Sequence, residues 1–272
     1  PHAEVPQRAQ PARQTGPAHE GPRLLVVARW PVGGIRSHLL VNYPRLAGAG
    51  YRCTFVGPAD DSLDALAAAL PTDEGAEFVG VPVRGRGCRL WQAVRGLLWT
   101  GRFALAHAHG VTAAAHATLA ALGLGVPLVV TLHEPLRAGQ FPGLRGALKR
   151  WLLARALRRA AAVITVSEDA RANLLEHLPP LRRHPERLLT LPNGIDGRRF
   201  TGPLPAGDVG LRQQLGLGAE PRLVGFLGRF MPEKGFPLLL EALALLSARD
   251  DVAPFHLVGF GSGDYRREYQ RA

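Results

Sequence analysis

The chain has 272 residues, of which 46% are hydrophobic, and it carries a formal net charge of +11. This composition is typical of a globular protein with one large domain or two smaller ones, and no apolar run is long enough to span a bilayer. A nucleic-acid-binding protein is an alternative, but it needs a clustered basic face with aromatic platforms. Because the arginines are scattered along the chain, we expect no nucleic-acid partner.

The first 21 residues are rich in Pro, Ala, Gln and Arg and contain no apolar stretch. They predict a disordered tail and not a signal peptide. The two cysteines, Cys53 and Cys88, provide neither a disulfide framework nor a metal cluster. Cys53 lies in an expected strand as a small core residue, and a reducing, cytoplasmic setting fits this cysteine usage.

Strand and helix patterns alternate along residues 22–180. The expected strands are Leu24–Ala28, Tyr51–Val56, Glu77–Val83, Ala104–His107, Leu128–Leu132 and Val163–Val166. The expected helices are Ile35–Leu46 (which Pro44 should end or kink), Asp61–Leu70, Cys88–Trp99, Val111–Leu122, Leu144–Ala160 and Glu168–Leu178. Repeated β-α units predict an α/β domain with a doubly wound parallel sheet.

Residues 181–218 are dense in Pro and Gly and predict an interdomain linker, within which Arg187–Leu191 is a candidate strand. A second β-α-β run occupies residues 219–272. Its elements are a strand at Arg222–Leu227, a helix at Phe236–Ser247, a strand at Pro254–Val258 and a helix that starts near Asp264. This run predicts the first half of a second Rossmann-like domain, as in a C-terminally truncated fragment.

The loop at residues 228–235, with the sequence GRFMPEKG, joins the strand at Arg222–Leu227 to the following helix. It carries Arg229 and Lys234, and Lys234 is one of only two lysines in the chain. Such loops lie at the carboxyl ends of parallel strands, where open sheets bind ligands. Two cations beside a helix amino terminus suit a diphosphate. The alternatives are two solvated surface cations or a local pair with Glu233.

Other candidates follow the strands of the first domain. Gly33 and Gly34 form either a plain tight turn or a backbone cradle for a phosphate or sugar oxygen. His107, His109 and His133 fall near the ends of expected strands, either as ordinary polar residues at a sheet edge or as a site. Since no acidic or cysteine partner stands at ligand spacing, we expect no metal.

Seven segments in this order resemble retaining glycosyltransferases of family 4, which have the GT-B fold. They are Gly33-Gly34, HAHG at 107–110, TLHE at 131–134, AVITVS at 162–167, LPNGID at 191–196 with Phe200, GRFMPEKG at 228–235 followed by LLLEA at 238–242, and VGFG at 258–261. The resemblance covers roughly residues 22–272. It implies transfer of a sugar from a nucleotide-diphosphate sugar to a saccharide, lipid or small-molecule acceptor, with retention of configuration and without a cofactor or metal.

The resemblance also implies roles for particular residues. Arg229 and Lys234 would bind the donor diphosphate and neutralise it as it leaves, and His133 would lie at the donor sugar. A weaker candidate, His109, would lie near the acceptor. Gly33 and Gly34 would bind a phosphate or sugar oxygen of the donor, and the glycine-rich loop with Gly259 and Gly261 would lie near the nucleotide. The cleft or hinge between the domains would include Asn193, Gly194 and Asp196, for which a simple Asn-Gly turn is the alternative.

Two departures from the family pattern limit the expected activity. Phe260 stands where the family often has an acidic residue, and no Glu-x7-Glu element follows Lys234. We therefore expect this chain to be inactive or weakly active, although its parent would be an enzyme. The alternative is a non-catalytic module that binds a sugar nucleotide or phosphate.

The helix expected at Leu144–Ala160 carries six basic residues among leucines and a tryptophan. A basic amphipathic helix can rest on an anionic membrane surface, which would place the chain peripherally at the inner face of the membrane. Arg155 interrupts the apolar stripe, so an ordinary solvated helix that covers the sheet is the alternative.

Overall fold

The structure is a computed structural model that describes residues 21–70, 76–82, 88–197, 201, 210–261 and 263. The chain divides into two compact units, Pro1–Gly197 and Arg198–Ala272. The expected tail (apart from Gly21) and the helix expected from Asp264 lie outside the described residues.

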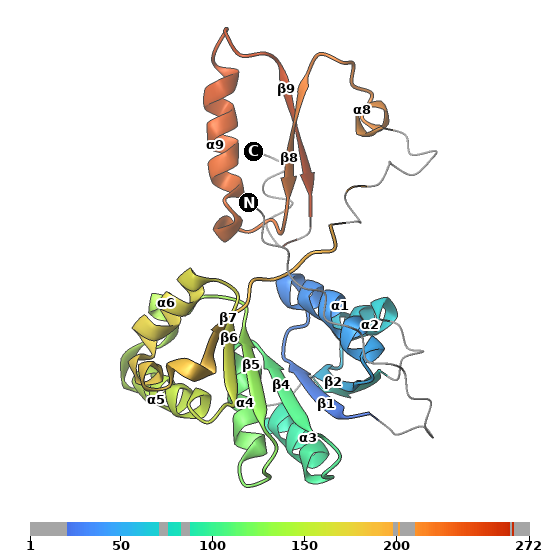
Figure 1. Cartoon of the computed structure of the whole chain (residues 1–272). Helices are drawn as coiled ribbons and strands as arrows, with labels where there is room; N and C mark the ends of the chain where they lie inside the picture. Colours follow the sequence, from blue (N-terminus) through green and yellow to red (C-terminus); the bar gives the residue numbers. More distant parts are fainter. Residues whose placement is uncertain are drawn as a thin grey trace, which may run out of the picture. The chain divides into compact units, whose positions relative to one another are not determined.

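The first unit is built on a parallel sheet of seven strands in the order β3-β2-β1-β4-β5-β6-β7 (Figure 1). The strands are β1 (Arg23–Ala28), β2 (Arg52–Pro58), β3 (Glu77–Val81), β4 (Leu105–His109), β5 (Leu128–Leu132), β6 (Ala162–Thr165) and β7 (Leu188–Thr190). All neighbouring pairs are parallel. The predicted doubly wound parallel sheet is thus confirmed.

Helices cover both faces of this sheet (Figure 1). They are α1 (Gly33–Gly48), α2 (Asp61–Ala69), α3 (Cys88–Trp99), α4 (Val111–Ala121), α5 (Gly143–Leu157) and α6 (Glu168–His177). Successive side chains of β1 point to opposite faces, so Leu25 and Val27 join the core under α3, α4 and α5, whereas Leu24 and Val26 join the core under α1 and α2. Each such buried side chain stabilises the fold by about 1.5–3 kcal/mol.

Several boundaries differ from the sequence predictions. Helix α1 continues through Pro44. The proline removes one intrahelical N–H donor, but packing of Leu39 and Tyr43 in the core also stabilises the helix. Strand β4 runs to His109 and not only to His107. Strand β7 joins the first sheet, so the first unit extends past residue 180 to Gly197, into the segment expected as a linker.

The strand order has a switch point between β1 and β4. From β1 the chain builds outwards through β2 and β3, and it then returns to the other side of β1 to place β4 and the later strands. The loops that leave β1 and β4 therefore diverge at the carboxyl end of the sheet. Open α/β sheets bind their ligands at such a point.

The second unit contains a parallel β-α-β motif, β8 (Arg222–Leu227), α9 (Phe236–Ser247) and β9 (Phe255–Phe260), preceded by a short helix α8 (Leu211–Gln214). Phe226, Phe230 and Phe236 pack against one another with ring centroids 4.6–5.6 Å apart and connect the motif to its first loop. Within the described part of the chain, no helix has both the length and the apolar character that crossing a membrane requires.

Candidate functional site

At the switch point, α1 begins immediately after the loop that leaves β1. Gly33 adopts a positive φ of 55°, which favours glycine, whereas Gly34 has no such requirement. Both glycines are exposed, and a Cβ at either would meet no atom within 4 Å. The open approach to this backbone fits the expected contact with a ligand as well as it fits a tight turn.

Four histidines and one tyrosine gather beside this turn. Strand β4 supplies His107 and His109, which are two residues apart and so lie on one face of the sheet. Helix α1 lies over that face and supplies Tyr43 and His38, and His133 follows β5. The ring centroids of His107 and His109 lie 4.1 Å apart, and the His38 centroid lies 5.0 Å from that of His133.

Hydrogen bonds join these side chains into a single chain of contacts. The Tyr43 hydroxyl lies 2.9 Å from His107 Nδ1 and 2.9 Å from His109 Nε2. At one end, His107 Nε2 lies 2.8 Å from Thr131 Oγ1. At the other end, His109 Nδ1 lies 3.1 Å from His133 Nε2. We call these five residues the histidine–tyrosine chain.

Burial keeps the three imidazoles of the histidine–tyrosine chain neutral. Desolvation, with smaller contributions from neighbouring histidines, lowers the pKa of His107 to about 3 and the pKa of His133 to about 4. The pKa of His109 lies well below its usual value for the same reasons. Burial also raises the pKa of Tyr43 well above its usual value, so the phenol keeps its proton.

The two histidines that were expected at the reaction centre differ in burial and in hydrogen bonding. We expected His109 near an acceptor, but its side chain is 1% exposed and both of its nitrogens face Tyr43 and His133. It is therefore placed to support its neighbours and not to contact a substrate. His133 is half-buried, and its Nδ1 has no hydrogen-bond partner in the structure, as expected of a group that awaits a ligand.

The segment expected at the cleft lies beside the same cluster. Asn193 Oδ1 is 2.9 Å from His38 Nδ1, so this nitrogen donates and the imidazole is held against His133. Gly194 and Asp196 follow at the end of the first unit, with Gly194 exposed and Asp196 half-buried. The hinge prediction for these residues stays a prediction.

In the second unit, Arg229 and Lys234 lie on the loop between β8 and α9. Both side chains are exposed, and neither forms an ion pair or hydrogen bond with any side chain that the structure describes. A 3₁₀ helix at Pro232–Lys234 shapes the loop, and Gly235, with φ of 74°, starts α9 without a side-chain cap. The cations thus flank a helix amino terminus whose N–H groups favour an anion.

Two glycines, Gly259 in β9 and Gly261 just after it, pack closely against this loop. A Cβ on Gly261 would come 1.8 Å from the carbonyl oxygen of Gly228, and a Cβ on Gly259 would come 2.9 Å from the Phe230 ring. The N–H of Gly228 donates to the Phe260 carbonyl at 2.9 Å. Gly259 and Gly261 therefore hold the Arg229 loop against β9, a packing role that is independent of the nucleotide contact expected for them.

Sequence reasoning missed His38 and Tyr43. Both lie on α1, where helical periodicity marks a buried face but does not show which residues reach the end of a neighbouring strand. The sequence did give their positions, since His38 lies about one helical turn and Tyr43 about three turns after Gly33-Gly34. Among the described residues, no three His, Cys, Asp or Glu side chains converge on a point that a metal ion could occupy.

A model of glycosyltransferase family 4 matches residues 32–199, which include the turn, the histidine–tyrosine chain and Asn193. The chain belongs to glycosyltransferase family 4. Its two units have the Rossmann-like, GT-B type of fold that the sequence predicted. The match covers the segments of the first unit that resemble the family, from Gly33-Gly34 to LPNGID at 191–196.

Several known proteins are similar to this chain. The alpha-maltose-1-phosphate synthase of Mycolicibacterium smegmatis is 35% identical over 128 residues, 46% of this chain and 33% of that protein. The phosphatidyl-myo-inositol mannosyltransferase of the same species is 29% identical over 249 residues, 87% of this chain and 58% of that protein. The structure of Anabaena HepE in complex with UDP superposes with a TM-score of 0.69 at 21% identity, over 92% of this chain and 65% of that one. This chain thus spans only part of the length of these proteins.

Proposed function

We propose that this chain belongs to a glycosyltransferase that moves a sugar from a nucleotide-diphosphate sugar to a hydroxyl of its acceptor, with retention at the anomeric carbon. The observation that supports it most strongly is the exposed pair of cations, Arg229 and Lys234, at a strand-to-helix loop of a family-4 fold, neither of which is paired with a side chain that the structure describes. The solved HepE structure contains UDP, which has the diphosphate that such a pair suits.

In this proposal the second unit binds the donor. The guanidinium of Arg229 and the ammonium of Lys234 contact the diphosphate oxygens, and the N–H groups at the start of α9 add partial positive charge. The negative charge on the diphosphate grows as its bond to the sugar breaks, so the two cations stabilise the transition state more than the bound donor. The departing diphosphate oxygen takes the proton of the acceptor hydroxyl on the same face of the sugar, which leads to retention.

The first unit supplies neutral hydrogen-bonding groups to the reaction. His133 Nδ1 is free to bond a sugar hydroxyl, and an uncharged imidazole does not repel positive charge that develops at the anomeric carbon. The backbone at Gly33 and Gly34 is open to an oxygen of the donor or the acceptor. No metal or cofactor takes part in this proposal.

A binding panel tests the donor class. We expect at least one nucleoside diphosphate and its sugar conjugate to bind this chain by calorimetry, while the parent nucleoside binds at least about tenfold more weakly, because it lacks the charged groups that contact Arg229 and Lys234. Binding is measured before turnover, since no Glu-x7-Glu element follows Lys234. If no nucleotide or nucleotide sugar binds at millimolar concentration, the proposal is wrong. Binding without transfer in a longer form of the protein would favour the non-catalytic module.

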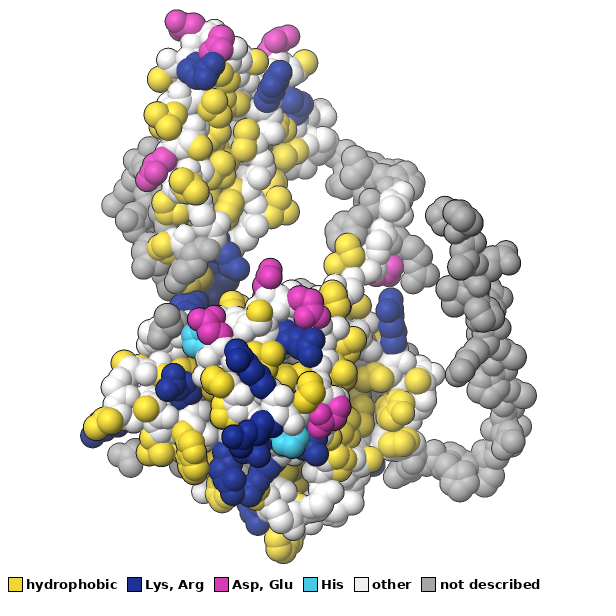
Figure 2. Space-filling view, turned by 60° about the vertical axis from the view of Figure 1, so that its left-hand side comes forward, with side chains coloured by type: hydrophobic (Ala, Val, Ile, Leu, Met, Phe, Trp, Pro, Cys, Tyr) yellow, Lys and Arg dark blue, Asp and Glu magenta, His cyan; other side chains and the backbone are white. Residues whose placement is uncertain are grey.

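We also propose that α5 contacts an anionic membrane surface. Its outward side exposes Leu144, Leu148, Trp151 and Leu152, and the helix contains no acidic residue. The exposed basic side chains Arg145, Lys149, Arg150 and Arg155 surround this stripe. In the view of the first unit in Figure 2, Lys and Arg side chains gather among exposed hydrophobic ones. Each basic residue near an anionic surface adds about 1 kcal/mol of attraction.

Vesicle sedimentation tests this contact. The chain should sediment with phosphatidylserine vesicles at low salt, less so at high salt, and not with phosphatidylcholine vesicles, because salt screens the attraction. Leu148→Ser should weaken binding, since Leu148 is 57% exposed on α5, whereas Leu119→Ser, at a leucine 52% exposed on α4, should not. Absence of binding to anionic vesicles at low and moderate salt alike would leave α5 as an ordinary solvated helix.

A further inference from the structure

The distances within the histidine–tyrosine chain limit which nitrogen of each imidazole can carry the proton. The Tyr43 hydroxyl has one proton, yet it lies 2.9 Å from a nitrogen of His107 and 2.9 Å from a nitrogen of His109. A neutral imidazole has one N–H and one lone pair. Tyr43 can therefore donate to only one of the two histidines, and the other histidine must donate to the tyrosine oxygen.

Two neutral arrangements satisfy all the contacts. In the first, Tyr43 donates to His107 Nδ1, His107 Nε2–H donates to Thr131, His109 Nε2–H donates to Tyr43, and His133 Nε2–H donates to His109 Nδ1. In the second, every one of these bonds is reversed. The three imidazoles all carry their proton on Nε2 in the first arrangement and all on Nδ1 in the second, with the same total number of protons.

One end of the histidine–tyrosine chain is His133 Nδ1, which is buried and has no hydrogen-bond partner in the structure. This nitrogen has a lone pair in the first arrangement and carries the proton in the second. His38 faces His133 and His109 from α1, with its own Nδ1 committed to Asn193. Cys53 is the other titratable group that interacts with Tyr43, from β2.

We propose that Tyr43 is a positioning residue that locks the tautomers of His107, His109 and His133 together, so that His133 Nδ1 is presented to a ligand as a neutral acceptor or a neutral donor. A ligand group that only donates, such as an N–H, selects the first arrangement, an anionic or carbonyl oxygen selects the second, and a hydroxyl can bind either one. The identity of that ligand as a sugar or a diphosphate rests on the proposed function, but the coupling itself does not.

Nitrogen NMR of the ligand-free chain, labelled with ¹⁵N-histidine, tests the coupling. At neutral pH the three imidazoles should all carry the proton on the same nitrogen. If both arrangements are populated, the fraction protonated on Nε2 should be the same for all three. His116 and His177 serve as internal references, because the Nδ1 of each faces the carbonyl of Thr112 or Asn173 and must carry the proton. If His107 carries its proton on Nε2 and His133 on Nδ1, or the reverse, this measurement on the unaltered protein overturns the proposal.

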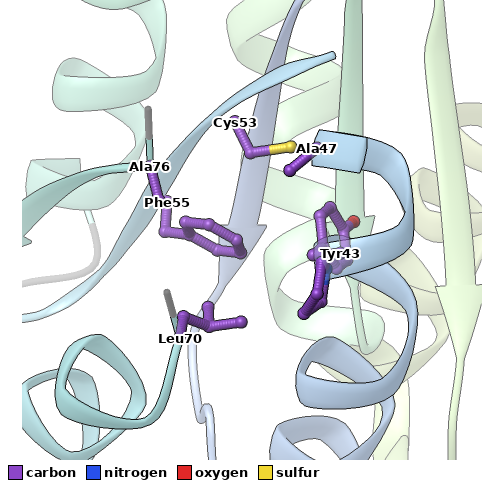
Figure 3. A pocket seen from close by; sticks show the side chains of 7 residues that line it. Tyr43, Ala47, Cys53, Phe55, Leu70 and Ala76 are labelled. Atoms are coloured by element: carbon purple, nitrogen blue, oxygen red, sulfur yellow. The ribbon is translucent and has the colours of Figure 1, made fainter. Parts of the chain in front are cut away.

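Tyr43→Phe then tests the role of the hydroxyl. The tyrosine ring packs against Phe55 with centroids 5.2 Å apart, in a small pocket lined also by Cys53 and Leu70 (Figure 3). The phenylalanine ring can keep this packing and loses only the hydroxyl. We expect His133 to lose its match with His107 and populate both tautomers, while His116 and His177 stay unchanged.

Tyr51→Phe is the matched control, because Tyr51 is exposed and lies outside the histidine–tyrosine chain. It should leave all the tautomers as in the unaltered chain. If folded Tyr43→Phe retains the same tautomers at His107 and His133, Tyr43 has no positioning role. Since no ligand is present, these outcomes are independent of whether the chain binds a nucleotide sugar.

Discussion

Replacing Arg229 and Lys234 together by alanine is expected to reduce the affinity for a nucleoside diphosphate by at least about a hundredfold. A hydrogen bond to a charged group contributes about 1.5–3 kcal/mol, so each cation accounts for roughly a 10- to 150-fold effect. Neither side chain has a described side-chain partner whose loss would disturb the fold. The measurement is calorimetric titration with the diphosphate that binds the unaltered chain most tightly.

The control for this pair is Arg222→Ala. Arg222 is an exposed arginine at the start of β8, and Arg229 follows the opposite end of the same strand. The control removes a positive charge from the same unit and should change the affinity by less than about threefold, because surface charges separated by more than a Debye length are screened. An unchanged affinity in the double variant would show that the diphosphate does not bind at this loop.

The second large effect is loss of stability of the first unit in mild acid. The pKa of His107 is lowered by burial to about 3, and the pKa of His133 to about 4, so both are neutral in the folded state at pH 5. In the unfolded chain their pKa is about 6.5, and they bind protons as the pH falls below that value. The unfolded state then holds more protons, so this stabilisation is complete above pH 6.5 and is lost as the pH falls.

The slope for each such histidine approaches about 1.4 kcal/mol per pH unit below the unfolded pKa, so His107 alone accounts for about 2 kcal/mol between pH 6.5 and 4.5. All four tryptophans lie in the first unit, so urea unfolding followed by tryptophan fluorescence reports on that unit. His107→Gln should flatten the dependence of the unfolding free energy on pH by the slope of one histidine. An equally steep dependence in this variant would contradict the neutral, buried state of His107.

The sequence predicted the sheet well because its strands are buried on both faces. Continuous apolar runs such as Leu24–Ala28 then stand out from the amphipathic helices between them. The weak element was β7, because Arg187–Leu191 was a candidate strand within an expected linker, and only its pairing with β6 places it in the first sheet. Tertiary pairing of this kind leaves no local pattern.

The candidate site was predictable in part. The order of the motifs indicated that His133, Gly33 and Arg229 follow strands, but it did not show that β4 continues to His109. That extension places His109 on the face of the sheet that α1 covers, where its side chain is buried and contacts Tyr43. Tyr43 itself occupies an ordinary core position of a helix, so no sequence pattern distinguishes its hydroxyl from a packing residue.

The two lysines of the chain provide the most direct test of the donor site. After reductive ¹³C-methylation, Lys234 on the β8–α9 loop and Lys149 on α5 give two lysine signals, one at the proposed site and one as an internal reference. Titration with UDP should shift the Lys234 signal and leave the Lys149 signal in place, while uridine shifts neither. If UDP binds and the Lys234 signal does not move, or if both lysines shift equally, the diphosphate is not held at this loop.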